Sequence, residues 1–503
     1  MKATHFLLLV LTVVVTMTSC ADLNKQTAKF EPTWDSLKQY EVPQWNKDAK
    51  FGIFIHWGVY AVPAVGSEWY PRNMYNKDSN LFEHHRKTWG DQSKFGYKDF
   101  IPKFHAEKWN PDEWAELFKR SGAKYIVPVA EHHDGFAMYD SSHTKWNSMK
   151  MGPKRDVCGE LARAVRKRGM KFGISTHYAW NWRYYFKDDS FDNIKPTYAG
   201  LYGVNHDPKA PASPEFISHW YDRTKELIDK YKPDLLWFDF GFCYPEFEQG
   251  RKNIAAYYYN KGIEWNKGVV LNYKRWTKPA DGVMEVAFPD GAGTLDLERE
   301  KSPRIREFFW QTDTSISKKS WGYIENDQLK SPDMLVDDLV DIISKNGCLL
   351  LNVGPRADGT IPQEAQEILL AIGNWLRTNG EAIYGTRPWK IFGEGPTGVA
   401  EGHLSENKNK PFTAEDIRYT QDGKYLYATA LDWPKSNKLT IRTLNSGTKV
   451  ATKGIASIEL LGSKDKIKWT RGATGLTIAL PVNKPGDYAY VFKIAPKGKL
   501  VMK

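Results

Sequence analysis

Short apolar runs alternate with amphipathic segments from about residue 49 to residue 355. The amphipathic segments have helical spacing of apolar positions, begin at Pro or Asp and mostly end at Gly or Pro: PDEWAELFKRSG, DVCGELARAVRKRG and PEFISHWYDRTKELIDKYK. The apolar runs read as strands: KFGIFIHWG, KYIVPVAEHHDGF, KFGISTHYAW, DLLWFDFGF, GVVLNYK, VMEVAF, REFFWQTDTSI and NGCLLLNVGP. This alternation predicts parallel strands covered by helices on both faces. About eight such units favour a (β/α)8 TIM-like barrel, with a doubly wound sheet as the alternative.

The pattern changes near residue 390, where helical spacing gives way to short alternating strands separated by turn residues. The strands are DIRYT, KYLYATAL, KLTIRTL, ASIELLG and GLTIALP. They predict a C-terminal antiparallel β-sandwich that packs against the barrel as a support. We therefore expect a catalytic barrel over residues 30–388 and a sandwich over 389–503.

The first 20 residues, MKATHFLLLVLTVVVTMTSC, have one early lysine, an apolar run and small polar residues before Cys20. This is the pattern of a secretory signal peptide, and the apolar run is too short to span a membrane. The ending MTSC resembles a bacterial lipobox, with Met17 where Leu is usual. It predicts a secreted protein, periplasmic or anchored as an outer-membrane lipoprotein of a bacterium through Cys20.

Composition narrows the class further. The 503 residues are 41% hydrophobic and 26% charged, as in a soluble globular protein, with 14% aromatic residues that suit both a core and sugar faces. The formal charge is +11, but the basic residues are scattered and no nucleic-acid motif is present, so no nucleic-acid partner is expected. Cys158, Cys243 and Cys348 do not form a disulfide framework and are expected in the core.

Polar residues follow most of the predicted strands. Because barrel active sites lie at the carboxyl ends of the strands, these residues are expected to converge on one mouth. In chain order they are His56-Trp57, Glu131-His132-His133-Asp134, His177-Tyr178, Trp237-Phe238-Asp239 and Asn272-Tyr273-Lys274-Arg275.

Asp239 has a structural alternative, since an Asp after a strand is often a helix N-cap. The following Phe240-Gly241-Phe242 does not predict a helix, which favours a functional carboxylate. A zinc site built from the histidines is a further alternative. No HxH or HExxH spacing supports it, and adjacent His132 and His133 should point opposite ways on a strand, with only one facing the mouth. Glycoside hydrolysis, which uses two carboxylates, fits the set without a metal.

At these positions the chain resembles the retaining α-L-fucosidases of glycoside hydrolase family 29. The motifs that carry the resemblance are ordered along residues 33–390: KFGIFIHWGVYAVPAVGSEWY, EHHDGF, DLLWFDFG, LDLERE, SWGY and NGCLLLNVGPRADGTIP. The resemblance implies an exo-acting enzyme that releases terminal fucose through a covalent fucosyl-enzyme, without a metal or organic cofactor. A fucoside-binding protein on an inactive barrel and a metal-dependent hydrolase remain as alternatives, and linkage preference is not fixed.

The resemblance also implies residue roles. Asp239 would be the nucleophile and Glu298 the acid/base, with Glu285 and Asp290 as alternatives to Glu298. Substrate-binding roles would fall to His56, Glu68, Trp69, His132, His133, Tyr178, Trp237 and Lys274. Two positions depart from the family pattern: ISTHYAW replaces the common double-Tyr motif, and Gln311 stands where many relatives have Glu.

Overall fold

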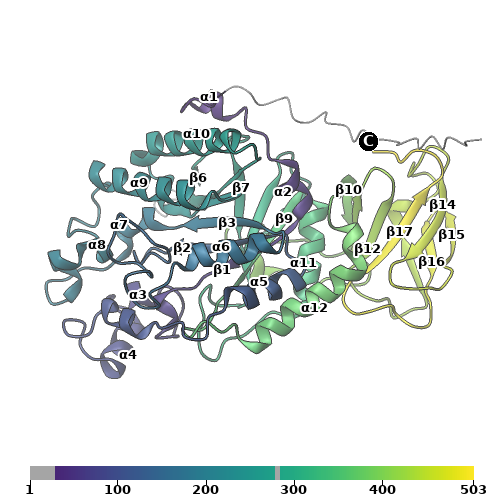
Figure 1. Ribbon diagram of the computed structural model, residues 1–503. Coiled ribbons are helices and arrows are strands. Elements are labelled where there is room, and N and C mark those ends of the chain that lie inside the picture. The colour runs from purple at the N-terminus through teal and green to yellow at the C-terminus, as the bar shows by residue number, and fades with distance from the viewer. Residues whose placement is uncertain (1–28, 278–283, 503) are drawn as a thin grey trace, which may run out of the picture.

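The computed structural model describes residues 29–277 and 284–502, so the predicted signal peptide and Cys20 lie outside the described part. Eight parallel strands pair in the order β4-β3-β2-β1-β9-β8-β7-β5, and a β4–β5 pairing closes the ring, which confirms the barrel (Figure 1). The strands are β1 (Phe51–Ile55), β2 (Tyr125–Glu131), β3 (Lys171–Thr176), β4 (Leu235–Phe238), β5 (Val270–Thr277), β7 (Thr294–Glu298), β8 (Trp310–Ser315) and β9 (Gly347–Val353).

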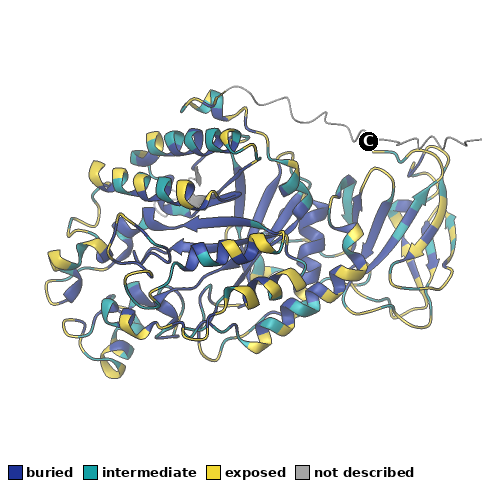
Figure 2. Ribbon diagram, viewed as in Figure 1, coloured by how far each residue is buried: buried dark blue, intermediate teal, exposed yellow. Residues whose placement is uncertain are grey.

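Helices cover the outside of the barrel. Most of them expose their outer faces, whereas the strands and the helix that faces the sandwich are buried (Figure 2). The covering helices are α5 (Pro111–Arg120), α6 (Val157–Lys167), α9 (Pro214–Tyr231), α10 (Glu248–Glu264), α11 (Pro332–Ser344) and α12 (Gln363–Asn379). The predicted helices correspond to α5, α6 and α9, whose N-caps Asn110, Asp156 and Ser213 accept backbone N–H groups of the first turn. Shorter helices are α1 (Trp34–Leu37), α2 (Gln44–Ala49), α3 (Tyr70–Asn73), α4 (Asn80–Thr88), α7 (Asn181–Tyr184) and α8 (Ala199–Tyr202).

One predicted barrel strand is wrong. The segment VMEVAF forms only the short strand β6 (Met284–Val286), which pairs antiparallel with the end of β5. The sixth barrel position belongs instead to β7, which pairs parallel with β5 and β8. Its sequence TLDLE carries two acids, and it therefore lacks the continuous apolar run by which the other strands were predicted. Glu298 consequently lies at the carboxyl end of a barrel strand.

The C-terminal part contains two antiparallel sheets, as predicted. The larger has the order β10-β11-β12-β17-β14 and the smaller β13-β16-β15. The strands are β10 (Arg387–Glu394), β11 (Ile417–Gln421), β12 (Leu426–Ala430), β13 (Lys438–Ile441), β14 (Ile455–Leu460), β15 (Lys468–Gly472), β16 (Gly475–Ala479) and β17 (Tyr490–Pro496). Leu426, Phe492 and Ile478 belong to one core that the two sheets share, which makes the unit a sandwich.

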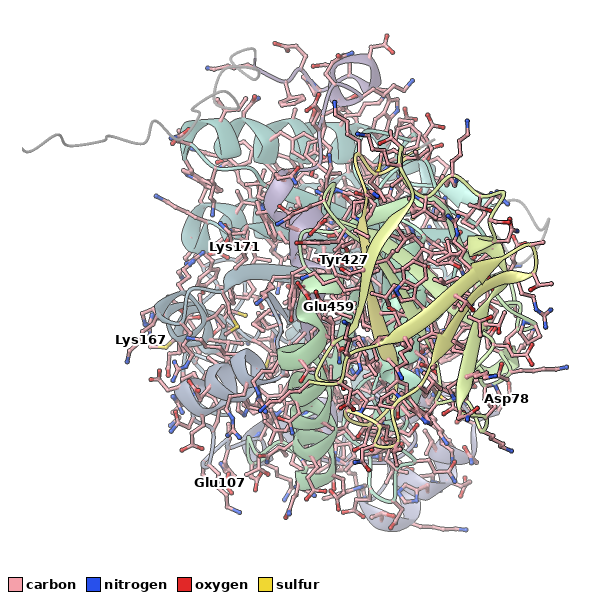
Figure 3. All side chains as sticks on the ribbon, turned by 90° about the vertical axis from the view of Figure 1, so that its right-hand side faces the viewer. Asp78, Glu107, Lys167, Lys171, Tyr427 and Glu459 are labelled. Atoms are coloured by element: carbon pink, nitrogen blue, oxygen red, sulfur yellow. The ribbon has the colours of Figure 1, made fainter. Side chains whose placement is uncertain are left out.

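Strands β11 and β12 of the larger sheet are buried along their whole length, because one face of the sheet covers the sandwich core and the other packs against the barrel. Tyr427 on β12 and Val491 on β17 belong to the main barrel core, and the indole N–H of Trp375 on α12 donates to the carbonyl of Ala489. In Figure 3 the sandwich lies in front of the barrel helices, with Tyr427 and the exposed Glu459 labelled on it. The sandwich therefore packs directly against the barrel through a shared core.

The cysteines and the long helices can be compared with what the sequence predicted. Cys158, Cys243 and Cys348 are all buried, as expected of small core residues. Among the helices of residues 29–277 and 284–502, we find none with the length and apolar character needed to cross a membrane.

Candidate active site

Asp239 follows β4 and sits among donors. Its Oδ2 lies 3.0 Å from both His133 Nε2 and His177 Nδ1, and its Oδ1 accepts the N–H of Phe240 at 2.9 Å. Burial works to raise the pKa of Asp239, but the charge of Lys274 and the two imidazoles outweigh it and hold the pKa well below its usual range. Asp239 is therefore an ionised carboxylate in a buried setting.

The expectation that no helix follows Asp239 is wrong. Residues Phe240–Cys243 form a short 3-10 turn, and Asp239 caps it. A Cβ on Gly241 would lie 2.4 Å from the backbone nitrogen of Trp180, so only glycine allows this turn to pack on the loop after β3. Capping uses Oδ1 and leaves Oδ2 to the imidazoles, so the carboxylate serves both purposes.

Lys274, on β5, connects the carboxylates of neighbouring strands. Its Nζ lies 3.4 Å from Asp239 Oδ1, 3.0 Å from Glu298 Oε2 and 3.4 Å from Asp313 Oδ2. Burial would lower the pKa of Lys274, but Asp239, Asp313 and Glu298 raise it well above its usual value. Because one ammonium contacts both, the nearest oxygens of Asp239 and Glu298 can be no further apart than the sum of their distances to Nζ. This upper limit is compatible with the separation of the two carboxyl groups in retaining glycosidases, roughly 5–5.5 Å.

Asp313 lies deeper than Glu298 on the adjacent strand and is fully buried. Burial and the nearby Asp296 raise its pKa well above the usual range. Below the mouth, the indole N–H of Trp237 donates to Asp296 at 3.0 Å, and the ring of Trp237 lies 4.8 Å from Lys274 Nζ. Trp237 is completely buried, so it forms the floor of the site.

A cluster of imidazoles lines the mouth beside Asp239. The rings of His56 and His132 lie 5.4 Å and 5.1 Å from that of His177. Burial is the main cause that lowers the pKa of all three, to about 4 for His177. His56 Nδ1 lies 2.7 Å from Asn352 Oδ1, an oxygen that only accepts, so this nitrogen carries the proton and Nε2 is left for a ligand.

The structure corrects the expectation that only one of His132 and His133 faces the mouth. Both come after β2 ends at Glu131, where the chain turns and the N–H of Gly135 donates to the carbonyl of His132. Strand alternation therefore does not apply. His133 reaches Asp239, and the ring of His132 packs against the rings of both His133 and His177.

Two loops complete the site. Glu68 Oε2 accepts the backbone N–H of Trp321 at 2.8 Å and the hydroxyl of Ser320 at 3.1 Å, while burial raises the pKa of Glu68. Trp69 packs its ring 5.4 Å from that of His133. The ring of Trp321 lies 5.2 Å from that of His56, a position that the SWGY motif marks but that strand-end reasoning missed.

Tyr178 does not join the site. Its hydroxyl lies 3.1 Å from His219 Nδ1 on α9, and its ring packs under the guanidinium of Arg223 at 4.2 Å. The preceding residue, His177, takes the place facing Asp239. The departure of ISTHYAW from the double-Tyr motif was the signal that could have identified His177.

The two alternatives to Glu298 as the acid/base, Asp290 and Glu285, lie in different parts of the chain relative to the mouth. Asp290 is exposed in the turn that precedes β7, at the opposite end of that strand from Glu298, and so lies away from the mouth. Glu285 is on β6, and its side chain lies outside the described residues.

Metal-ligating atoms also come together here. The nitrogens of His56, His132 and His177 lie within 4.8 Å of one another, as do the ligand atoms of His133, His177 and Asp239. The first set consists of neutral imidazoles, which suit a transition metal and equally suit an array of sugar hydroxyls.

A closed barrel that gathers carboxylates, imidazoles and a lysine at the carboxyl ends of its strands defines a barrel enzyme with a buried polar site. A model of the α-L-fucosidase family matches residues 17–381, and a model of the α-L-fucosidase C-terminal domain matches residues 409–495. The chain therefore belongs to the α-L-fucosidase family and is a glycoside hydrolase.

Individual proteins that are similar to this chain are also named α-L-fucosidases or α-fucosidases. Tissue α-L-fucosidase of Rattus norvegicus is 33% identical over 468 residues, which cover 91% of this chain and 90% of the relative. The Homo sapiens tissue enzyme is 32% identical over 477 residues, covering 93% and 92%. The Thermotoga maritima α-fucosidase in complex with fucose has 32% identity and a TM-score of 0.73, covering 93% of this chain and all of that one.

Proposed function

We propose that Asp239 and Glu298 carry out the α-L-fucosidase reaction by double displacement. The observation that carries the proposal is Lys274, whose ammonium contacts both carboxylates and so keeps the two close together. Asp239 is kept ionised by its surroundings, as a nucleophile must be. Glu298 is more accessible, with 12% of its side chain exposed against 6% for Asp239. This suits a group that exchanges protons with a leaving group and with water.

In the first step, Asp239 attacks the anomeric carbon, the glycosidic bond breaks, and the proton of Glu298 moves to the departing oxygen. In the second step, ionised Glu298 removes a proton from water, which attacks the anomeric carbon and releases Asp239. The product keeps the α configuration, and transfer to another sugar hydroxyl uses the same intermediate.

The positions of the side chains support the proposed binding roles. His56 and His132 present imidazoles to fucose hydroxyls, with Glu68 held at the same mouth by Trp321. His133 does not, contrary to the sequence-based expectation, because its two ring nitrogens contact Asp239 and the carbonyl of His177; it positions the carboxylate instead. Trp69 forms a wall beside His133. Trp237 supports the floor, and Lys274 balances the carboxylate charges. We leave Tyr178 out of this set and add His177 as a residue that positions Asp239, because its two ring nitrogens contact Ser175 and Asp239.

The test is release of nitrophenol from 4-nitrophenyl α-L-fucoside, beside other aryl glycosides. We expect turnover of the fucoside alone, a loss of about 10³-fold or more in Asp239→Ala, and rescue of Glu298→Ala by azide as a fucosyl azide. Asp290→Ala is the matched control and should retain activity. Full activity in Asp239→Ala would refute the assignment, and azide rescue of Glu285→Ala alone would transfer the acid/base role to Glu285.

The histidine cluster supports one alternative function, that of a metal-dependent hydrolase. Activity that survives dialysis against EDTA supports the two-carboxylate mechanism. Loss that zinc restores would support the metal instead. An inactive fucoside-binding barrel would show binding on a glycan array and no turnover by the wild-type chain.

For location, we propose export and a lipid anchor at Cys20, supported by the signal-like residues 1–20. Expressed in a bacterium, the wild type should fractionate with membranes and Cys20→Ser with the soluble periplasm. Equal fractionation of the two would contradict the anchor.

A further inference from the structure

The loop between β10 and β11 leaves the sandwich and returns to the barrel mouth beside Glu298. The backbone N–H of Leu404 donates to the carbonyl of Glu298 at 3.2 Å, and the N–H of Glu406 donates to the carbonyl of Arg299 at 2.9 Å. Residues 402–406, which we call the rim segment, therefore attach directly to the end of β7.

A buried ion cluster fixes the rim segment in place. The carboxylate of Glu406 pairs with Arg299 through Oε1 and with Lys330 at 2.8 Å through Oε2, and it also accepts the hydroxyl of Thr314. Burial would raise the pKa of Glu406, but Lys330 and Arg299 outweigh it and lower the pKa, so the carboxylate is ionised. Removing one member of such a cluster would leave a buried charge without its partner, which is strongly destabilising. The cluster therefore holds the rim segment in this one arrangement.

The backbone at this junction is strained on both sides. Arg299 has φ 45° and Leu404 has φ 58°, both in the left-handed region that non-glycine residues rarely adopt. Such strain persists where surrounding contacts determine the conformation, and it gathers at functional sites. Here the ion cluster supplies those contacts.

The result is a surface on the solvent side of Glu298. Nε2 of His403 lies 3.8 Å from Glu298 Oε2, and the His403 side chain is 48% exposed. Leu404, next to it, is 47% exposed although it is a large apolar residue. An imidazole and an exposed aliphatic side chain thus flank the open face of the proposed acid/base.

We propose that His403 and Leu404 form the binding site for the leaving sugar, the unit to which fucose is attached. This rests on Glu298 as the acid/base. The proton of Glu298 goes to the glycosidic oxygen, so the departing sugar must lie against the exposed side of that carboxyl. His403 hydrogen-bonds a hydroxyl of that sugar, and Leu404 packs against its C–H face. The sandwich thereby selects the saccharide from which fucose is removed, and the acceptor to which it is transferred.

The test compares two donors in the full-length protein. α-L-Fucosyl fluoride has no leaving sugar, whereas fucosyl disaccharides with α1,2, α1,3, α1,4 and α1,6 linkages have one. In His403→Ala we expect the ratio of kcat/KM for the preferred disaccharide to that for the fluoride to fall about tenfold. With the fluoride as donor, the fraction of fucosyl-enzyme captured by acceptor sugars rather than water should fall as well. Lys408→Ala, an exposed basic residue just beyond the rim segment, is the matched control and should change neither quantity.

An unchanged ratio together with an unchanged transfer fraction in His403→Ala would overturn the proposal. So would a wild type that neither cleaves the disaccharides nor transfers to sugars. Leu404→Asn, which tolerates the left-handed backbone, provides a second variant with the same expected direction. Failure of Glu298 itself is recognised separately, because Glu298→Ala would then show no azide rescue while the His403 ratio still shifts.

Discussion

His177 and His133 each place a ring nitrogen 3.0 Å from the carboxylate of the proposed nucleophile, Asp239, and the surroundings of His177 fix its protonation. Nε2 lies 2.5 Å from the hydroxyl of Ser175, while Nδ1 lies 3.0 Å from Asp239 Oδ2. A neutral ring that accepts from Ser175 and carries its proton on Nδ1 satisfies both contacts. Burial, opposed by the charge of Asp239, lowers the pKa of His177 to about 4.

This pKa has a consequence for stability. An unfolded histidine has a pKa of about 6.5, so between pH 6.5 and 4 the unfolded chain binds a proton at His177 that the folded chain does not. Lowering the pH through this window therefore lowers the free energy of unfolding, on the order of 3 kcal/mol for this group. The loss is complete only below the folded-state pKa.

A titration by NMR on histidine-labelled protein checks this directly. The signal of His177 is identified by its absence in His177→Asn. We expect it to show a neutral imidazole at pH 6 and protonation near pH 4. A midpoint at pH 6 or above would contradict the account of a neutral imidazole beside Asp239.

Gln311 on β8 is paired with Asp296 on β7 and is hydrogen-bonded on both sides of its amide group. Its amide donates to Asp296 Oδ2, and its Oε1 accepts the hydroxyl of Tyr125 at 3.0 Å. All three side chains are buried. A glutamate at this position would place a second carboxylate against Asp296 with no donor between them.

Gln311→Glu should therefore lower the free energy of unfolding at pH 7 by about 1–3 kcal/mol. The loss should be smaller at pH 5, because a protonated glutamic acid can donate to Asp296 as the amide does. Denaturant unfolding at the two pH values measures this, with Gln311→Met as the uncharged control. An equal loss at both pH values in Gln311→Glu would show that charge is not the cause.

At the scale of elements, the sequence predicted what local pattern encodes. Continuous apolar runs gave seven of the eight barrel strands, and capped amphipathic segments gave α5, α6 and α9. β7 was missed because its inward positions carry Asp296 and Glu298, which contribute to the site. The turn after Asp239 was missed since it depends on a close approach of Gly241 to Trp180, a contact distant in the sequence.

At the scale of the whole molecule, the sandwich is joined to the barrel by buried charge as well as by apolar packing. Arg418 on β11 pairs with Asp341 on α11 at 2.6 Å, and Glu406 pairs with Lys330 at the mouth. No local pattern in the sequence marks these partners, which lie more than 70 residues apart. The prediction of a supporting sandwich was therefore correct in position, but it missed the approach of the rim segment to Glu298.

The measurement that tests the central claim most directly is to trap the intermediate. A 2-deoxy-2-fluoro-α-L-fucosyl fluoride should esterify the enzyme and turn over slowly, because the fluorine destabilises the charged transition states. We predict one added fluorofucosyl group by intact mass, located by peptide mass spectrometry on Asp239 and absent from Asp239→Ala. A label on another carboxylate, or turnover of the fucoside without any covalent adduct, would contradict Asp239 as the nucleophile.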